Sequence, residues 1–363
     1  MTQFNKQLNP NFIPIAEPTL GKEEEELVLD ALRSGWISST GKYIQTFEEE
    51  FAKFCDVKYA VAVSNGTTAL HLAIKSLDIG PGDEVIIPSL TFVATANAVS
   101  YAGAKPILID VDLETWNIDP HQITSKINER TKAIIPVHLY GHPANMGLIK
   151  QIAKKNNLYI IEDAAEAHGA MYKKKMVGSI GTLGCFSFYG NKVITTGEGG
   201  MITTNNYLLS QKIRILRDHG ASRTRKYYHP QIGYNYRMTN LQAAIGVAQL
   251  RKIQKILKRR HEIGILYQKL LSPLIPMITL QPKAQWAKNI FWMNSILINK
   301  NSSKNRDYLI KKLRENNIDS RPFFYPVHLL PMYRITEKLP ITELLSKQGI
   351  SLPSSANLSD ETV

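Results

Sequence analysis

The sequence predicts an α/β protein with a large domain, in which a mostly parallel sheet lies between helices, and a smaller C-terminal α/β domain. Between residues 59 and 162, short apolar segments of strand length alternate with segments of helical periodicity. That alternation is typical of a mostly parallel sheet covered by helices on both faces. A long helical pattern starts at residue 241 and leads into a second, shorter set of elements. We therefore expect a large domain with an N-terminal arm over residues 1–240, and a long linking helix with the small domain over residues 241–363.

The chain before the sheet predicts an irregular arm and two helices. Residues 1–20 carry prolines at positions 10, 14 and 18, which favour an arm without regular structure. The next segment has acidic residues early and Arg33 late, which matches the helix dipole. A later segment carries phenylalanines at helical spacing, which we interpret as core packing. The two expected helices are Glu23–Arg33 and Tyr43–Phe54, separated by the loop Gly35–Gly41.

The sheet itself is predicted from short apolar runs bounded by polar turns. The expected strands are Tyr59–Val63, Glu84–Pro88, Pro106–Asp110, Lys132–Val137 and Leu158–Glu162. The expected helices between and after them are Ala69–Leu77, Phe92–Ala102, Pro120–Ile127 and Met146–Asn156. Two further strand-like segments, Cys185–Phe188 and Met201–Thr204, flank a polar stretch that contains a single lysine.

The pattern of alternating strands and helices ends after residue 219. Arg223–Asn235 is polar and aromatic and predicts a loop, and Leu241–Tyr267 predicts one long helix. For the small domain we expect a strand at Phe291–Asn299, a helix at Asp307–Asn316 and a Pro-rich loop at Arg321–Pro331.

The composition is that of a globular protein, with 44% hydrophobic and 21% charged residues. No apolar run reaches membrane-spanning length, and the first residues contain no signal-peptide core, so we expect no membrane partner. The two cysteines, Cys55 and Cys185, form no CxxC pair. That spacing argues against a disulfide framework or a zinc cluster, and it fits a reducing cytoplasm.

The formal net charge of +13 favours anionic substrates or polyanions, which raises the alternative of a nucleic-acid-binding regulator. The lysines and arginines are spread along the chain rather than massed in a tail. The sequence also contains no helix-turn-helix signature, zinc finger or basic–aromatic RNA motif. We therefore expect no nucleic-acid partner.

Lys192 stands between two predicted strands and is flanked by glycines, including the turn Gly197–Gly200. An amine in a tight, partly dry pocket has a lowered pKa, because burial disfavours its charged form. Such an amine can attack a carbonyl, as Schiff-base lysines do. The alternative is a hairpin lysine that points into water.

The segment Asn65-Gly66-Thr67-Thr68 lies where a predicted strand leads into a helix. Free backbone N–H groups and the positive end of the helix dipole make such a place a phosphate site. The threonine hydroxyls add donors, and Gly66 lets an anion approach closely. The alternative is ordinary N-capping by Ser64 or Thr67.

Asp163 follows the most apolar predicted strand, so its carboxylate is expected at the strand end where open α/β sheets bind ligands. Burying a carboxylate unpaired is costly, and it therefore needs a lysine, a metal or a protonated ring nitrogen as partner. Asp163, Glu166 and His168 are close enough in sequence to raise a metal site. Zinc and iron sites use other spacings, so we expect no metal, and His168 is more typical of a hydrogen-bonded core histidine.

A nucleophilic lysine, an anion cradle and a strand-end carboxylate are together what pyridoxal phosphate requires. Lys192 would form the Schiff base, Asp163 would pair with the pyridinium nitrogen, and the cradle would hold the phosphate. Phe92 is the candidate for an aromatic ring against the cofactor face. We therefore expect pyridoxal 5'-phosphate as the cofactor, with pyridoxamine phosphate in the cycle.

Five stretches of the chain resemble the sugar aminotransferases of the DegT/DnrJ/EryC1/StrS family. They are SNGTTALHLA, PSLTFVATANA, EDAAEAHGA, SFYGNKVITTGEGGM and GYNYRMTNLQAAIG, and they appear in the family's order. The resemblance spans nearly the whole chain, from Ile13 to Asp360. It implies the type I fold of pyridoxal phosphate-dependent aminotransferases and an obligate homodimer whose active site is shared between subunits.

The resemblance also implies roles for individual residues. It places the cofactor on Lys192 and the ring nitrogen beside Asp163. Glu166 stands beside the ring hydroxyl, where many members of the family have Gln. The other implied cofactor residues are Phe92 for ring stacking, with Gly66, Thr67 and Ser187 for the phosphate, joined by Asn235 of the partner subunit.

The implied reaction moves an amino group from glutamate to a nucleotide-linked keto sugar and leaves 2-oxoglutarate. One dehydratase branch of the family carries His in place of the lysine, and this chain keeps Lys192. The stretches FYGNKVITTGEGGM, YYHPQIGYNYRMTN, NIFWMNSI and SRPFFYPVHLLPMY look most like members that aminate C4 of GDP-4-keto-6-deoxymannose.

Fold and family do not fix the substrate, so two alternatives stay open: another nucleotide-linked keto sugar, and a pyridoxal phosphate-dependent sugar dehydratase. Arginine suits bidentate contacts with the substrate diphosphate. The candidate substrate residues are Arg237, Arg321, Tyr325 and His328, each of which is equally compatible with a structural role.

Overall fold

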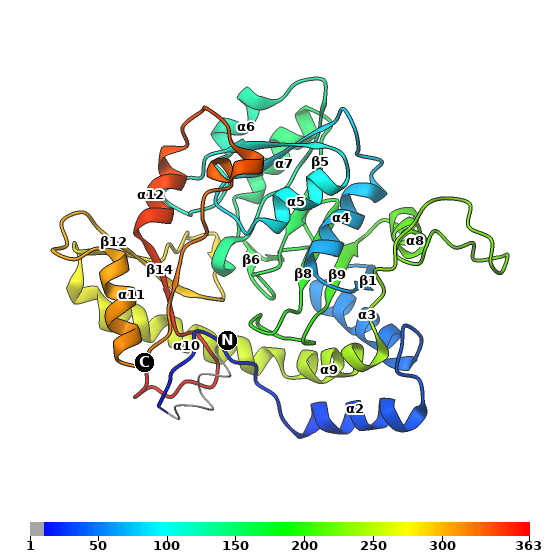
Figure 1. Cartoon of the computed structure of the whole chain (residues 1–363), viewed down its shortest axis with the longest axis horizontal. Coiled ribbons are helices and arrows are strands. Elements are labelled where there is room, and N and C mark those ends of the chain that lie inside the picture. The colour runs from blue at the N-terminus through cyan, green and yellow to red at the C-terminus, as the bar shows by residue number, and fades with distance from the viewer. Residues whose placement is uncertain (1–10) are drawn as a thin grey trace.

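The computed structural model describes residues 11–363, so the first half of the predicted arm lies outside the described residues. A seven-stranded sheet forms the centre of the molecule (Figure 1). Its order is β1 (Tyr59–Val63), β9 (Gly200–Thr204), β8 (Leu183–Ser187), β5 (Tyr159–Asp163), β4 (Thr131–Ile134), β2 (Glu84–Pro88) and β3 (Lys105–Ile109). The strands from β8 to β3 run parallel, and β9 is antiparallel to both of its neighbours. The predicted mostly parallel α/β sheet is therefore confirmed.

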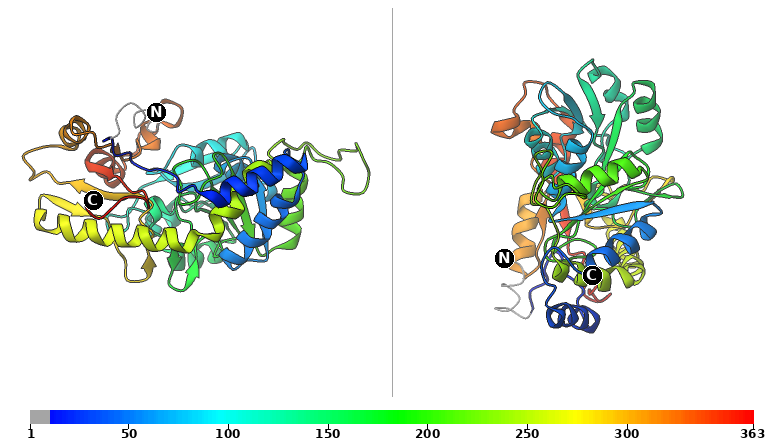
Figure 2. Two further views of the ribbon diagram at one scale, coloured as in Figure 1. Left: turned by 90° about the horizontal axis from the view of Figure 1, so that it is seen from below. Right: turned by 90° about the vertical axis from the view of Figure 1, so that its right-hand side faces the viewer.

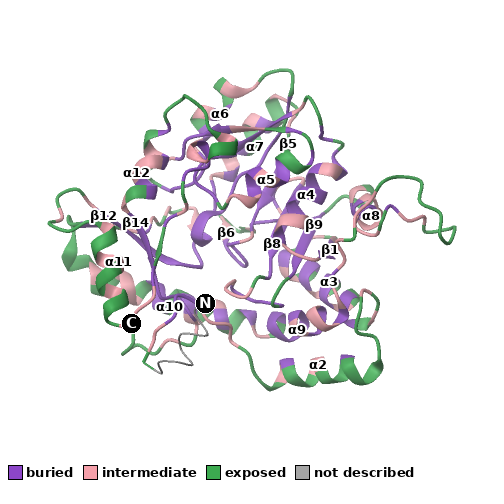
Figure 3. Ribbon diagram, viewed as in Figure 1, coloured by how far each residue is buried: buried purple, intermediate pink, exposed green. Residues whose placement is uncertain are grey.

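Helices cover both faces of this sheet, namely α3 (Lys42–Cys55), α4 (Gly66–Ser76), α5 (Ala94–Tyr101), α6 (Pro120–Lys126), α7 (Met146–Lys155), α8 (Tyr207–Leu216) and α9 (Asn240–Arg251). Side chains of a strand point alternately to its two faces. Val85 and Ile87 of β2 accordingly pack in the layer of α4, α5 and α8, while Ile86 packs in the layer of α6 and α7. Beside β8 the second layer is formed by α3 and α9, where the ring of Phe51 lies 5.0 Å from that of Phe186. Most residues of these strands are buried (Figure 3), as expected for a sheet covered by helices, whereas the edge strand β3 begins with the exposed Lys105.

The prediction of a single helix over Leu241–Tyr267 is wrong. The helical segment is interrupted at Lys252, where α9 ends and α10 (Ile253–Leu271) begins (Figure 2). Helix α9 packs against α2 (Lys22–Ser34) and α3, whereas α10 continues beneath the small domain. Lys252 forms an ion pair of 2.5 Å with the buried Glu24 of α2. The break therefore lies where the helical segment passes from one packing surface to another.

The small domain is built on an antiparallel sheet in the order β10 (Ile278–Leu280), β12 (Asn294–Ile298), β14 (Gly349–Leu352) and β13 (Arg321–Pro322). It also contains α11 (Arg306–Glu315) and α12 (Pro340–Gln348). The described part of the arm runs along this domain, since Ile13 forms a parallel bridge with Ile318 and the Ile15 carbonyl accepts the Ser354 N–H. The domain boundary at residue 240 stays a prediction.

Several shorter elements were not expected from the sequence, α8 among them. The hairpin β6 (Met171–Tyr172) and β7 (Lys175–Met176) forms a third sheet with β11 (Ala287–Lys288). Turns of 3₁₀ type occur at Leu139–Gly141, Ser272–Leu274, Val327–Leu329 and Pro331–Tyr333. Among the described residues, no helix combines the length and apolar character needed to cross a bilayer.

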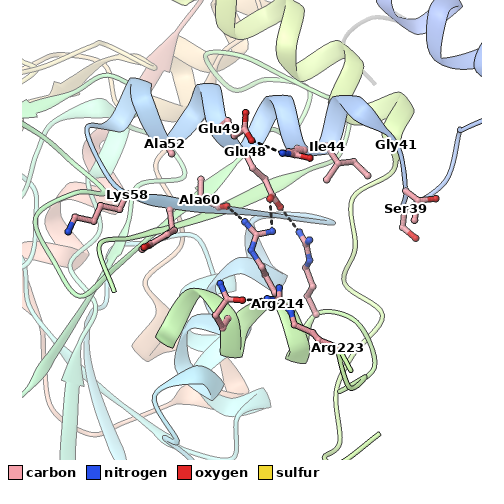
Figure 4. A pocket seen from close by; sticks show the side chains of 15 residues that line it. Ser39, Gly41, Ile44, Glu48, Glu49, Ala52, Lys58, Ala60, Arg214 and Arg223 are labelled. Atoms are coloured by element: carbon pink, nitrogen blue, oxygen red, sulfur yellow. Dashed lines mark hydrogen bonds and ion pairs between the residues drawn. The ribbon is translucent and has the colours of Figure 1, made fainter. Parts of the chain in front are cut away.

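A cavity of about 530 Å³ lies between α3, β1 and α8 (Figure 4). At its wall the buried Glu48 accepts hydrogen bonds from Arg214 at 2.5 Å and from Arg217 at 2.7 Å. The two guanidinium groups also donate to the carbonyls of Ala60 and Ala62. Both arginines are therefore paired with Glu48 and already hydrogen-bonded, and the cluster ties the three elements together.

Replacing Glu48 with Gln is expected to destabilise the protein by roughly 2–4 kcal/mol, because two largely buried guanidinium groups would lose their counter-charge. Urea unfolding monitored by circular dichroism measures the change. Glu49→Gln is the matched control on an exposed position of the same helix, where about 0.5 kcal/mol or less is expected. Equal stability of the Glu48 and Glu49 variants would show that the arginine cluster does not hold these elements together.

Candidate active site

A second cavity, of about 500 Å³, lies at the carboxyl ends of β5 and β8, beside the first turn of α4. Ligands of open α/β sheets bind at this edge. The cavity brings together seven of the residues that the sequence predicted: Gly66, Thr67, Phe92, Asp163, Glu166, Ser187 and Lys192. They come from four separate parts of the chain, and folding of the sheet brings these parts together.

Lys192 lies in the turn between β8 and β9, and its side chain is only 11% exposed. Its Nζ is 3.7 Å from Oε1 of Glu166 and 3.9 Å from the centroid of the Trp292 ring. Burial lowers the pKa of the Lys192 amine, while the nearby carboxylates of Glu166 and Asp163 act in the opposite direction. The alternative of a solvated hairpin lysine is therefore excluded, and the site holds an amine that can lose its proton.

Asp163 ends β5 with a carboxylate that is buried beside the cavity. Its Oδ2 accepts the Thr95 hydroxyl at 2.8 Å, and its Oδ1 accepts the Ala165 N–H at 3.2 Å. Burial raises the pKa of Asp163, and these hydrogen bonds partly offset the effect. Among the described residues no cationic side chain forms an ion pair with Asp163, so the carboxylate is free to pair with a cationic ligand atom in the cavity.

Glu166 is buried on the same side of the cavity. Its Oε2 accepts the main-chain N–H of Tyr140 at 2.9 Å, and its Oε1 faces Lys192. Burial raises the pKa of Glu166 to about 7, against the favourable charge of Lys192. The carboxyl group of Glu166 can therefore take up a proton close to neutral pH.

Replacing Glu166 with Gln is expected to change how stability depends on pH. The folded-state pKa of about 7 lies above the ordinary value of 4.5, so between these pH values the folded protein binds the proton more tightly than the unfolded chain. Wild-type stability should therefore fall as pH rises through this window, by up to about 3 kcal/mol, and Gln removes that loss. Urea unfolding of the cofactor-free proteins at about pH 5 and pH 7.5 measures the difference. Identical pH dependence in both proteins would contradict the raised pKa.

The first turn of α4 forms the predicted anion cradle. Asn65, rather than Ser64 or Thr67, caps the helix, because its Oδ1 accepts the Thr68 N–H at 2.9 Å. The N–H groups of Gly66 and Thr67 therefore have no acceptor within the helix. They lie at the end of α4 that borders the cavity. A Cβ on Gly66 would lie 2.8 Å from Cβ of Ser187, so only glycine fits here. The cradle, with the hydroxyls of Thr67 and Ser187, has the donors that a phosphate needs.

Asn235 and Arg237 do not line this cavity in the described chain. Asn235 is exposed, and its side-chain oxygen accepts the Arg237 guanidinium at 3.0 Å. Arg237 also pairs with Asp218 at 2.9 Å. Both residues follow the segment that projects beyond α8 in Figures 1 and 2. One copy of the chain therefore leaves them outside its own cavity.

The other candidate substrate residues also lie outside the cavity. Arg321 pairs with Asp319 at 3.1 Å, and Tyr325 is 62% exposed beside the cavity-lining Phe324. His328 is fully buried, with Nδ1 2.7 Å from the Ser89 hydroxyl and Nε2 3.4 Å from Glu343. These contacts give His328 a structural environment and no access to a ligand in this cavity.

The structure gives no support to a metal site at Asp163, Glu166 and His168. Within residues 11–363, no group of three or more His, Cys, Asp or Glu side chains is arranged to hold a metal ion. His168 is buried among the rings of Phe51, Phe186 and Phe188. Burial there lowers the pKa of His168 to about 3, so the ring is neutral.

Sequence reasoning missed four residues of the site: Thr95, Tyr140, Trp292 and Phe324. Thr95 and Tyr140 hydrogen-bond the two carboxylates, and Trp292 and Phe324 line the cavity from the small-domain side. Trp292 and Phe324 belong to stretches that carry the family resemblance, NIFWMNSI and SRPFFYPVHLLPMY. The family resemblance therefore indicated the two segments that contain Trp292 and Phe324, but it did not single out these two rings.

Fold and cavity together match the requirements of one cofactor. The first turn of α4 offers donors suited to a phosphate, Asp163 offers a carboxylate suited to a protonated ring nitrogen, and Lys192 offers a buried amine suited to an aldehyde. The protein is a pyridoxal phosphate-dependent transferase. It belongs to the DegT/DnrJ/EryC1/StrS aminotransferase family, whose model matches residues 18–363.

Known relatives cover nearly the whole chain. The GDP-perosamine synthase of Caulobacter vibrioides is 46% identical over 353 residues, which are 97% of this chain and 95% of that protein. The GDP-perosamine synthase of Escherichia coli O157:H7 is 47% identical over 353 residues, 97% of this chain and 96% of that protein. The PLP form of the putative sugar aminotransferase Spr1654 from Streptococcus pneumoniae superposes with a TM-score of 0.91 at 28% identity, over 96% of this chain and 95% of that one. The predicted family, fold and cofactor are confirmed.

Proposed function

We propose that the protein transfers an amino group from glutamate to the C4 keto group of GDP-4-keto-6-deoxymannose. The product is GDP-perosamine, a precursor of polysaccharides such as O-antigen, made in the reducing cytoplasm. The observation that carries this proposal is the identity of 46% and 47% to two GDP-perosamine synthases over 97% of the chain. A lysine in the place that a dehydratase branch fills with histidine supports amine transfer over deoxygenation.

The cofactor, when bound, supplies an aldehyde that takes up the amino group and an electron-poor ring that stabilises negative charge beside it. Lys192 attaches the cofactor through Nζ and, once released, moves a proton between carbon atoms as a general base and acid. Burial lowers the pKa of Lys192, which suits this task because the amine gives up its proton more readily than an exposed lysine does. Glu166 lies 3.7 Å from this amine and would stand beside the ring hydroxyl of the bound cofactor.

The remaining residues hold the cofactor in place. Asp163 would pair as a carboxylate with a protonated ring nitrogen, and Thr95 fixes the orientation of that carboxylate. The N–H groups of Gly66 and Thr67 would bind the phosphate, together with the hydroxyls of Thr67 and Ser187. Phe92, whose ring lies 5.7 Å from that of Phe324, would cover one face of the cofactor ring.

The active form in this proposal is a homodimer, in which Asn235 of the partner subunit reaches the phosphate. Asn235 is exposed and lies outside its own chain's cavity. The segment before it carries apolar side chains that are almost fully exposed, Tyr227 at 87% and Ile232 at 88%. Contact with a second copy would bury them. We assign the partly exposed Arg237 and the exposed Arg321 and Tyr325 to the nucleotide sugar. We assign His328 to the support of its loop.

Purified protein with glutamate and a panel of GDP-, UDP- and dTDP-linked 4-keto-6-deoxy sugars tests the proposal by mass spectrometry. The expected result is an aminated product from the GDP-linked mannose derivative and much slower turnover of the others. Amination of a UDP or dTDP sugar instead would assign a different nucleotide. A deoxygenated product would establish the dehydratase alternative.

A further inference from the structure

Trp292 lies two residues before β12 of the small domain, and its ring lies directly against the amine of Lys192. The distance from Nζ to the ring centroid is 3.9 Å. The indole N–H donates to the main-chain carbonyl of Asn191 at 2.9 Å. Trp292 therefore contacts both the reacting atom of Lys192 and the backbone that carries it.

Contacts with Arg260 and Tyr140 hold Trp292 in position. Its carbonyl accepts a hydrogen bond of 3.0 Å from Arg260 of α10, which also donates to the Ser354 carbonyl at 2.8 Å. Arg260 is buried, and in the described part of the chain it forms no ion pair with a carboxylate. The ring of Tyr140 stacks on Trp292 at 6.3 Å, with an angle of 17° between the planes. These contacts leave the indole little freedom to turn away from the amine.

The carboxylates that act on Lys192 come from the opposite side of the cavity. Glu166 lies 3.7 Å from Nζ, and Asp163 acts from the end of β5. His168 also interacts with Lys192, but it is neutral because burial lowers its pKa to about 3. Trp292 is the contact that the small domain contributes. The face of an indole ring carries negative electrostatic potential and attracts an ammonium more strongly than other aromatic rings do.

We propose that Trp292 is a catalytic residue whose ring face stabilises the free amine of Lys192 in its protonated form. The inference rests on the proposed role of Lys192, whose Nζ takes up a proton and later returns it during amine transfer. A ring face stabilises the protonated state without adding another charge that burial would disfavour. It also keeps Nζ beside the cavity while the amine is detached from the cofactor.

The test measures the protonation of Lys192 in the cofactor-free protein. The rate of acetylation of Lys192 is followed against pH by peptide mass spectrometry, with the exposed Lys174 as an internal reference. In Trp292→Leu the midpoint of the profile should move down by about one pH unit, since a desolvated cation–π contact contributes about that much. Trp292→Phe keeps a weaker ring and should show a smaller decrease. Trp286→Leu is the matched control, because Trp286 packs on Tyr172 away from the cavity.

In the loaded enzyme, Trp292→Leu should lower kcat and shift the acidic limb of its pH profile in the same direction, with little change in KM for glutamate. An unchanged or raised midpoint of the acetylation profile in Trp292→Leu would overturn the proposal. If Trp292→Leu does not fold, an unchanged midpoint in Trp292→Phe would overturn it instead. Cofactor attachment to wild-type Lys192 is measured separately. Its failure would refute the proposed function, whereas attachment with an unmoved midpoint would refute only the role of Trp292.

Discussion

Lys192→Ala should lose amine transfer, with kcat reduced by at least about 10⁴-fold, and should lose the visible absorbance of the bound cofactor. The variant lacks both the amine that attaches the cofactor and the group that moves the proton. Because Lys192 forms one weak ion pair at 3.7 Å with Glu166, its removal should leave the fold intact. Turnover with saturating glutamate and keto sugar, together with an absorbance spectrum, provides the measurement.

Lys174→Ala is the control for this experiment, since Lys174 is exposed in the turn between β6 and β7. It should match the parent in both activity and absorbance. If Lys192→Ala retained the absorbance and the turnover of the parent, the cofactor lysine would have to lie elsewhere in the chain.

Asp163→Asn is expected to reduce kcat by about 10²–10³-fold at saturating cofactor. The amide keeps the shape of the side chain. It also keeps an oxygen that can accept the Thr95 hydroxyl, which in the parent protein lies 2.8 Å from Oδ2. It removes the negative charge that holds the ring nitrogen protonated, and the ring then stabilises negative charge less well. The measurement is kcat at cofactor concentrations high enough to compensate for weaker binding.

Thr95→Val provides a graded comparison, because it keeps the carboxylate and removes only one of its hydrogen bonds. A loss of about tenfold or less is expected there, corresponding to one hydrogen bond of roughly 1 kcal/mol. Parent-like kcat in Asp163→Asn would show that the charge of Asp163 is not used by the cofactor.

The sheet could be predicted from the sequence because each of its strands is a short apolar run that ends at a polar turn. Tyr59–Val63 and Glu84–Pro88 match the structure residue for residue. The break between α9 and α10 could not be predicted, since residues 241–267 have unbroken helical periodicity. Only the tertiary contacts, including the Lys252–Glu24 ion pair, separate the two helices.

The cavity residues that belong to short local motifs could be predicted from the sequence. Gly66 and Thr67 follow a strand, Asp163 ends one, and Lys192 lies between two. The contact between Trp292 and Lys192 was not predictable, because the two residues lie 100 positions apart and Trp292 falls inside the expected strand Phe291–Asn299. Its contact with Nζ arises only when the small domain folds against the large one.

The attachment point of the cofactor is the most direct measure of this account. The purified protein, loaded with pyridoxal phosphate, is treated with borohydride to make the attachment permanent, digested and analysed by mass spectrometry. The account predicts a single modified peptide, with the added mass on Lys192. Modification of a different lysine, or no modified peptide from a protein that binds the cofactor, would contradict it.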